Sequence, residues 1–296
     1  NRKNGFNAWI SIMRGCDKFC TFCIVPFTRG RERSRPIESI KSEVVNAVKQ
    51  GFLEVTLLGQ NVNSYLTPSG GFSFLLENLA QINGLKRIRY TSPHPKDIDE
   101  NLLKIMSKYD NICDYIHLPL QAGSDRILSR MNRTYTSAQF LSLVELINKI
   151  LPNCSLSTDI IVGFPGETDA QFQDTLKVME RVGYSSSFMF SYSPRPGTPA
   201  SEFEDSVPLE TKSKRLQEII KLQNRLTQEQ VQSYKGKTVE VLIEGGSSKP
   251  GYSFKGRNPQ YWRVNLKGNE KKFQPGDIVQ VNIEKTSGHS LSGLIQ

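Results

Sequence analysis

Three of the five cysteines in this chain, Cys16, Cys20 and Cys23, fall in the stretch CDKFCTFC. The C-x3-C-x2-C spacing puts three thiols on one short loop and leaves a tetrahedral ligand set one short. A structural zinc site usually pairs C-x2-C with a second pair of ligands downstream, whereas Cys113 and Cys154 are isolated here. A [4Fe–4S] cluster is held by cysteine thiolates. The loop therefore favours a cluster over zinc, with one iron open to bind a substrate or cofactor directly.

Strand-like apolar runs alternate with helical patterns from about residue 8 to residue 192. The predicted strands cover residues 8–13, 54–59, 87–92, 114–120, 155–164 and 184–192. The predicted helices between them cover residues 37–50, 72–82, 96–108, 136–151 and 168–182. Strands joined by crossover helices predict an α/β fold with a parallel sheet, either doubly wound or barrel-like.

Candidate site residues follow the predicted strands at their carboxyl ends, where the active sites of both α/β architectures lie. The residues just past these strand ends are Cys16, Gly59, Ser92, Gln121 and Gly163. We expect them to share one face of the sheet with the cysteine loop.

The character of the sequence changes after Tyr192. A proline-rich loop over 193–200 leads to a long polar helix pattern over 209–234, and short β-rich runs follow at 238–245, 261–266, 277–286 and 290–295. We predict two domains: residues 1–234, an α/β domain with a C-terminal helix, and residues 235–296, a small all-β barrel.

The formal net charge is +9, which favours a polyanionic partner. Five cysteines, three of them clustered, do not form a disulfide framework, so we expect a reducing cytoplasm. No run of about 18 apolar residues indicates a membrane span.

Two groups of basic and aromatic residues are candidates for binding RNA. The loop RGRERSRP carries Arg29, Arg31, Arg33 and Arg35 directly after the cysteines. The β-rich region carries Tyr252, Lys255, Arg257, Trp262 and Arg263. Aromatic rings stack on unpaired bases and cations track the backbone of single-stranded RNA. A solvated loop and an ordinary barrel core are the alternatives for the two groups.

The cysteine spacing, with the aromatic Phe22 directly before the last cysteine, resembles the signature of radical S-adenosylmethionine (SAM) enzymes. The resemblance implies a partial (β/α)6 TIM-like barrel. It also implies that the open iron chelates the amino and carboxylate groups of SAM, and that an electron from the cluster releases a 5′-deoxyadenosyl radical.

The same resemblance implies further contacts to SAM. Gly59 and Gln60 lie where the family has a loop that takes the amino group of the methionine moiety, although many members have an acid in place of Gln60. Arg133 would pair with the carboxylate through its fork of donors. Gln121 and Asp159 would bind the ribose; Ile161 and Gly163 would line the adenine pocket, and Ser92 is a further contact candidate.

Across nearly the whole chain, segments such as GCDKFCTFCIVPFTRGRERSRP, LGQNVNSY and STDIIVGFPGET resemble the methylthiotransferase family. The β-rich region resembles a TRAM domain, an RNA-binding barrel with an OB-like shape. The segments favour members that add a methylthio group to isopentenylated adenosine in the tRNA anticodon stem-loop. Siblings that act on threonylcarbamoyladenosine or on a ribosomal-protein aspartate are the close alternatives. A non-catalytic RNA-binding protein with a structural iron–sulfur or zinc site is the alternative of another class.

One family feature is missing. Members carry a second [4Fe–4S] cluster, held by three cysteines of an N-terminal domain, which takes up the sulfur. The chain has no second cysteine triplet and opens NRKNGFNAW without Met. We expect it to lack that domain, to bind one cluster and to cleave SAM without inserting sulfur. The resemblance further implies an electron donor of flavodoxin or ferredoxin type and an iron–sulfur cluster carrier.

Overall fold

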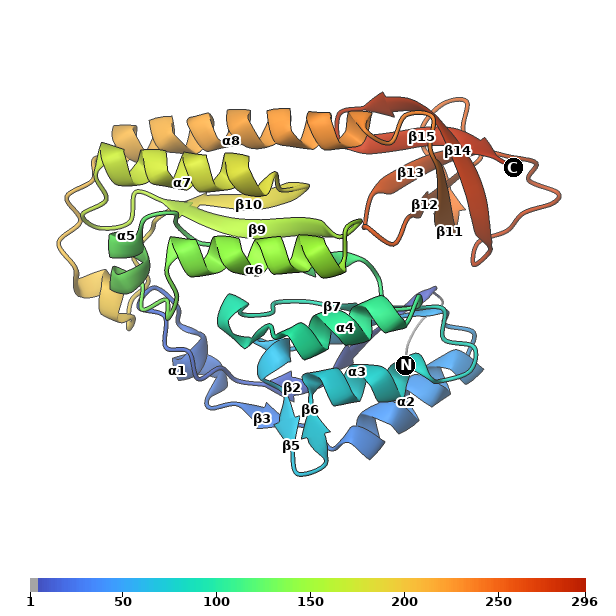
Figure 1. Ribbon diagram of the computed structural model, residues 1–296, viewed down its shortest axis with the longest axis horizontal. Coiled ribbons are helices and arrows are strands. Elements are labelled where there is room, and N and C mark those ends of the chain that lie inside the picture. The colour runs from blue at the N-terminus through green and yellow to red at the C-terminus, as the bar shows by residue number, and fades with distance from the viewer. Residues whose placement is uncertain (1–4) are drawn as a thin grey trace.

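The computed structural model describes residues 5–296, which form an α/β part, a long connecting helix and a β barrel (Figure 1). The α/β part is built on strands that all overlap the predicted ones. They are β1 (Asn7–Ser11), β4 (Glu54–Leu58), β7 (Arg87–Tyr90), β8 (Tyr115–His117), β9 (Ser155–Val162) and β10 (Ser186–Ser191).

These strands lie side by side in chain order. β1, β4 and β7 form one parallel sheet, and β8, β9 and β10 form a second. A single parallel bridge between Ile88 and Ile112 joins the two sheets. Within residues 5–296 no pairing joins β10 back to β1, so the barrel stays open on one side. Sequential order excludes a doubly wound sheet, in which the order reverses, and confirms the partial TIM-like barrel.

Amphipathic helices cover the outer face of the strands. They are α2 (Ile37–Lys49), α3 (Phe72–Ala80), α4 (Glu100–Lys108), α6 (Ser137–Ile150) and α7 (Asp169–Val182). Ile37, Ile40 and Val44 form the buried stripe of α2, with the spacing that one helix face requires. Capping boxes at Thr136 and Thr168 begin α6 and α7.

Several short elements lie wholly or partly outside the predicted strands and helices, because they are too short to show a hydrophobic period; only β2 and η2 overlap a predicted strand and a predicted helix. They are β2 (Met13–Arg14), α1 (Val25–Arg29), β3 (Arg33–Ser34), η1 (Val62–Ser64), β5 (Leu66–Thr67), β6 (Gly70–Gly71), η2 (Pro95–Asp97), α5 (Asp125–Arg130) and η3 (Pro199–Glu202). The pairing of β2 with β3 brings the arginine-rich segment beside the start of the cysteine loop.

The C-terminal part is a closed barrel with the strand order β11-β12-β13-β15-β14. Its strands are β11 (Thr238–Gly246), β12 (Phe254–Arg257), β13 (Arg263–Lys267), β14 (Ile278–Ser287) and β15 (Ser290–Ile295). The sequence patterns missed β12, a strand of four residues that contains Gly256. A Cβ at Gly256 would lie 2.1 Å from the carbonyl oxygen of Leu242, so the close approach of β11 requires glycine there.

Helix α8 (Leu209–Gln232) runs along α7 and β10 and ends at the barrel (Figure 1). It is anchored by the buried Arg215, which forms ion pairs with Glu167 at 2.9 Å and Asp169 at 2.7 Å. Neither α8 nor any other helix in the described range is long and apolar enough to cross a membrane.

The barrel is docked against the amino ends of the α/β strands by two arginines of β7. Arg87 donates to the carbonyl oxygen of Arg257 at 2.7 Å and pairs with Glu240 at 2.8 Å. Arg89 donates to the carbonyl oxygens of Asn258 and Pro259 at 2.9 and 2.8 Å. The two parts are therefore joined by buried, directional contacts in addition to α8.

Candidate active site

The three clustered cysteines lie on the loop between β2 and α1. Cys20 is buried, and Cys16 and Cys23 are half-buried. A hydrogen bond from the backbone N–H of Cys23 to the carbonyl oxygen of Cys20, 3.0 Å long, folds the second half of the loop into a turn. Burial raises the pKa of the Cys16 thiol to about 11 and also raises that of Cys23.

Contacts from distant segments hold this loop in place. Gly15 has φ +80°, and a Cβ there would lie 2.1 Å from the carbonyl oxygen of Arg31. The N–H of Gly15 donates to Oε1 of Gln60 at 2.6 Å. At the far side, the Thr21 hydroxyl donates to the carbonyl oxygen of Arg130 at 2.8 Å. The loop is thus fixed at both ends before any metal binds.

The donor set fits an iron–sulfur cluster better than a single ion. Among residues 5–296, no three cysteine, histidine, aspartate or glutamate side chains converge closely enough to hold one metal ion. In a [4Fe–4S] cluster each thiolate binds a different iron, so the sulfurs lie farther apart than the ligands of one ion. Three thiols on one loop are the donor type that such a cluster takes.

Arg133 lies directly beside the cysteine loop and is almost completely buried. Its Nη1 donates to Sγ of Cys20 at 3.4 Å, its Nη2 to the carbonyl oxygen of Pro119 at 2.9 Å, and its Nε to the Tyr135 hydroxyl at 3.0 Å. The guanidinium is held rigidly, with its charge next to the thiols. A buried cation there favours an anion or a thiolate close by.

A cleft of about 600 Å³ opens next to the loop. Phe22, Cys23, Gln121, Asp159 and Ile161 line it, together with Phe190, Tyr192 and Arg195. The Oε1 atom of Gln121 is buried without a hydrogen-bond partner. A buried polar atom that lacks a partner costs free energy unless a ligand or water satisfies it. The cleft therefore presents an unused acceptor beside the cysteines.

Asp159 is oriented by a short chain of polar side chains. Its Oδ2 lies 3.3 Å from Nε2 of His117, and Nδ1 of His117 lies 2.8 Å from Oγ of Ser157. Both ring nitrogens of His117 are thus engaged. The carboxylate keeps its second oxygen for a ligand in the cleft.

Four residues expected around SAM have other neighbours. Gln60 bonds Gly15, and a Cβ at Gly59 would lie 2.6 Å from Cγ of Met13, so this glycine allows tight packing. The N–H of Gly163 donates to Glu167 at 2.6 Å, and its Cα faces Lys212 of α8. Ser92, with φ +55°, lines a separate cavity deeper in the barrel.

The arginines after the cysteine loop differ in whether their guanidinium groups are exposed and unpaired. Arg29 and Arg33 are exposed and form no ion pair within the part of the chain that the structure describes. Arg31 is exposed but forms a two-point contact with Asp17, at 2.6 and 3.2 Å. Arg35 bonds the carbonyl oxygen of Ser11 and pairs with Glu43 at 2.8 Å, which ties β1 to α2. Arg35 therefore has a structural position.

In the barrel, Tyr252 and Trp262 have opposite environments. The Tyr252 ring lies between Lys249 and Lys267, whose Nζ atoms are 5.0 and 5.6 Å from the ring centre. Lys255 is exposed. Trp262 is 6% exposed and belongs to the barrel core, and the part of its ring that the core leaves open lines a cleft at the edge of the barrel. The core alternative therefore describes most of this ring.

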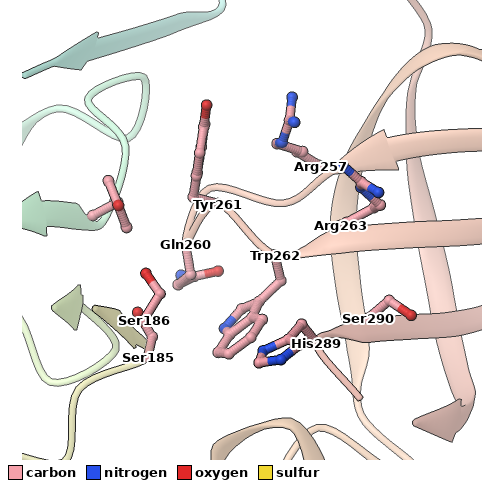
Figure 2. A pocket seen from close by; sticks show the side chains of 10 residues that line it. Ser185, Ser186, Arg257, Gln260, Tyr261, Trp262, Arg263, His289 and Ser290 are labelled. Atoms are coloured by element: carbon pink, nitrogen blue, oxygen red, sulfur yellow. The ribbon is translucent and has the colours of Figure 1, made fainter. Parts of the chain in front are cut away.

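A second cleft, of about 540 Å³, separates the barrel from the starts of β8 and β10 (Figure 2). Arg257, Arg263 and His289 lie on its barrel side, and Ser185 and Ser186 lie on the other. Arg257 pairs with Glu244 at 2.7 Å. Cations at this junction can reach a polyanion that touches both parts of the molecule.

Two residues of the site were missed by sequence reasoning. His117, which orients Asp159, lies inside the predicted strand 114–120 and belongs to no motif of the sequence. Arg195 lines the cleft beside Cys23, and its position after the sixth strand, in SPRPG, was the available signal. Both sit at carboxyl ends of strands or just inside them, as the α/β rule requires.

Comparison with protein families gives two matches. The model described as the radical SAM superfamily matches residues 10–179, and that described as the TRAM domain matches residues 232–295.

The chain is similar to curated proteins named tRNA-2-methylthio-N(6)-dimethylallyladenosine synthase. It is 45% identical to that of Clostridium botulinum strain Hall over 99% of this chain and 65% of the relative. It is 48% identical to that of Parabacteroides distasonis over 97% of this chain and 64% of the relative. The chain thus spans a little under two thirds of the length of these relatives.

Solved structures with a similar fold are more distant. The radical SAM methyltransferase TsrM of Kitasatospora setae has a TM-score of 0.56 and 19% identity, over 67% of this chain and 39% of that one. Coproporphyrinogen III oxidase of Escherichia coli has a TM-score of 0.55 and 19% identity, over 75% of this chain and 53% of that one. At this identity the likeness concerns the fold alone. The family match over more than half of the chain, together with the cysteine loop, shows that the chain belongs to the radical SAM superfamily.

Proposed function

We propose that this chain is the radical SAM part and RNA-binding part of a tRNA methylthiotransferase that acts on N6-dimethylallyladenosine. The observation that carries the proposal is the identity of 45–48% to synthases of that name, which runs through both domains. The geometry supports it, because a cysteine loop, a ligand cleft and a basic barrel occur in one rigid body.

In this proposal Cys16, Cys20 and Cys23 hold a [4Fe–4S] cluster through one iron each, and the fourth iron takes SAM. When bound, the cluster supplies the electron that cleaves SAM reductively. The chain itself fixes the loop through Gly15 and Thr21, so the thiols are arranged before binding.

The cleft residues bind and orient the cofactor. The unpartnered Oε1 of Gln121 accepts from a ribose hydroxyl, and Asp159, held by His117, accepts from the other. Arg133 faces the methionine carboxylate beside Cys20. Phe22 and Ile161 supply apolar surface for the adenine. We remove Gln60, Gly59, Gly163 and Ser92 from the direct contacts and assign them to positioning the loop and the strand ends.

The proposed RNA contacts follow from exposure. Arg29 and Arg33 offer free cations near the cysteine loop, and Tyr252 offers a ring flanked by two lysines. Lys255 is exposed on the barrel, and Arg257 and Arg263 line the cleft of Figure 2, so these cations can contact the RNA backbone. Arg31 contributes only if Asp17 releases it, and we exclude Arg35 and Trp262.

The sulfur-inserting step requires more than the residues of this chain. Cys113 and Cys154 are the remaining cysteines and lie far apart in sequence, so a second cluster must be held by other residues. We propose that the enzyme works in the cytoplasm on the tRNA anticodon stem-loop. An electron donor of flavodoxin or ferredoxin type and an iron–sulfur cluster carrier serve it there.

Anaerobic reconstitution tests the proposal. We expect about four irons per chain, release of 5′-deoxyadenosine from SAM after reduction, and no methylthiolated RNA from this chain alone. The triple substitution Cys16→Ala, Cys20→Ala, Cys23→Ala should abolish both iron binding and SAM cleavage. Cys113→Ala is the matched control and should retain both.

Retained cleavage in the triple variant, or about eight irons in the unmodified chain, would contradict the assignment of one cluster. Comparison of stem-loops that carry dimethylallyladenosine or threonylcarbamoyladenosine separates the proposed substrate from its sibling. A protein that binds RNA but yields no 5′-deoxyadenosine would be the non-catalytic alternative.

A further inference from the structure

Large aromatic side chains with more than half of their surface exposed line the inside of the open barrel. Trp9 on β1 is 55% exposed and Phe188 on β10 is 58% exposed. Both residues line one cavity of about 270 Å³, so they face each other across the unpaired side of the barrel. Burying such rings against an apolar ligand is favourable, and leaving them in water is costly.

The β barrel supplies the floor of this cavity. Tyr261 stands on the loop that reaches from the barrel toward the α/β strands (Figure 2) and lines the same cavity. Its backbone has φ +72°, and its ring lies 4.8 Å from the Arg89 guanidinium and 5.0 Å from the Tyr115 ring. A strained backbone held by two partners indicates a fixed position for this ring.

Three polar side chains of the cavity, Arg89, His117 and Tyr115, already have hydrogen-bond partners in the protein. Arg89 donates to Glu54, Asn258 and Pro259. His117 uses both ring nitrogens, and Tyr115 bonds Ser157 at 2.7 Å. A polar ligand would lose its water without gaining these partners, whereas an apolar ligand has nothing to lose. The cavity is therefore suited to a hydrocarbon group.

Volume decides how much of a substrate can enter. If each non-hydrogen atom takes about the space of one water molecule, about 30 Å³, a five-carbon chain needs about 150 Å³. The cavity of about 270 Å³ therefore has room for the chain. The purine ring can then lie toward the cleft beside Cys23.

The cavity and the cleft adjoin each other. Phe188 lines the cavity and Phe190, two residues on along the same face of β10, lines the cleft. Phe188 is also the strand partner of Asp159, which lines the cleft. A base whose N6 substituent enters the cavity leaves C2 at the cleft, because the two positions lie on either side of N1.

We propose that the cavity walled by Trp9 and Phe188 and floored by Tyr261 holds the dimethylallyl group of the substrate adenosine and selects for prenylated tRNA. This proposal rests on the proposed function for the identity of the base. It assigns to the TRAM domain a part of the substrate pocket in addition to a surface for RNA.

Tryptophan fluorescence provides a direct test, because the chain has only two tryptophans and Trp262 is buried in the barrel core. The probes are two anticodon stem-loops that differ only in carrying dimethylallyladenosine or adenosine. With the 296-residue chain we expect the prenylated RNA to shift the Trp9 emission to the blue and to bind about ten-fold more tightly, about 1.4 kcal/mol. Trp9→Phe should remove the shift and Trp262→Phe should keep it.

The preference for prenylated RNA should fall about ten-fold in Phe188→Ala and in Tyr261→Ala. Phe74→Ala, which removes an exposed ring from the outer helix α3, is the matched control and should keep the preference. Equal affinity of the unmodified chain for both RNAs, or an undiminished preference in both cavity variants, overturns the proposal. Failure of SAM cleavage would instead count against the proposed function, since the RNA-binding assay does not depend on it.

Discussion

Gln60 makes a single hydrogen bond that we expect to decide how well the cysteine loop is held. Its Oε1 accepts from the N–H of Gly15 at 2.6 Å, one residue before the first cysteine. Gln60→Leu leaves that buried N–H without an acceptor, at a cost of about 1–3 kcal/mol. The variant should therefore lose its cluster to a chelator several-fold faster, as followed by the visible absorbance of the cluster.

Gln60→Glu is the control, because a carboxylate oxygen still accepts from Gly15. The affinity for SAM, measured on the holo fraction of Gln60→Leu, should stay unchanged. A large loss of SAM affinity with normal cluster retention would restore the original prediction that Gln60 binds the amino group of the cofactor.

Single residues were the hardest part of the site to predict from the sequence. The cysteines, Gln121 and Asp159 could be named as site candidates from the sequence. The spacing of the cysteines and the strand-end positions of the other two residues indicate a site. For Arg35 and Trp262, a sequence does not show that Glu43 pairs with the arginine or that a barrel core encloses most of the ring. In both cases the tertiary partner, not the residue type, determines what the side chain does.

At the scale of elements, the turn that leads into the cysteine loop depends on one glycine. Gly15 has φ +80°, and any Cβ would lie 2.1 Å from a backbone oxygen of Arg31. Gly30 has a similar φ of +76° but open space around it. Gly30→Ala should cost about 1–3 kcal/mol for the backbone conformation alone, because φ 76° with ψ −166° is a region that other residues rarely adopt. Gly15→Ala should cost more, because the β2–β3 hairpin must also shift.

Thermal unfolding of the two variants, combined with their iron content after reconstitution, separates the cost of the backbone conformation from the cost of the contact with Arg31. We expect Gly15→Ala to show the lower midpoint and to retain little iron, whereas Gly30→Ala retains its cluster. Equal midpoints and equal iron contents would mean that the contact with Arg31 does not constrain the loop.

The long elements were predictable because their apolar residues recur with the period of a helix or a strand. The apolar stripe of α2 and the apolar runs of the parallel strands gave element type and order correctly. β2, β3 and β12 escaped, because two to four residues cannot show a period and Gly256 weakens a strand pattern. The open side of the barrel could not be predicted either, because no local sequence pattern indicates whether β10 pairs with β1.

At the scale of the whole molecule, the contacts between the α/β part and the β barrel determine whether the barrel can form the floor of the cavity. Arg87 and Arg89 on β7 donate hydrogen bonds to backbone carbonyl oxygens of the barrel segment 257–259, and the next residues along the chain place Tyr261 under the α/β strands. A TRAM domain on a free tether would bind RNA but would leave the barrel floor undefined. Here the floor is part of the same rigid body as the cysteine loop.

Arg89→Met tests these contacts. The substitution keeps the aliphatic bulk but leaves Glu54, itself buried, without its partner at 3.0 Å, together with two carbonyl oxygens. Removing one partner of a buried ion pair costs about 3–5 kcal/mol. We expect chemical denaturation to show a loss of this size and hydrogen exchange to show faster exchange of the 258–262 amides, because the barrel segment loses its anchor.

Arg87→Met is the matched control on the same strand. Its carboxylate partner Glu240 is 42% exposed and stays solvated after the arginine is lost, so the loss of stability should be clearly smaller. The double variant Glu54→Gln, Arg89→Met should recover part of the stability, because it removes the buried unpaired charge, but it should not restore slow exchange at 258–262. Slow exchange in Arg89→Met itself would show that Arg87 and α8 hold the barrel in place without Arg89. In that case the position of Tyr261 would not depend on Arg89.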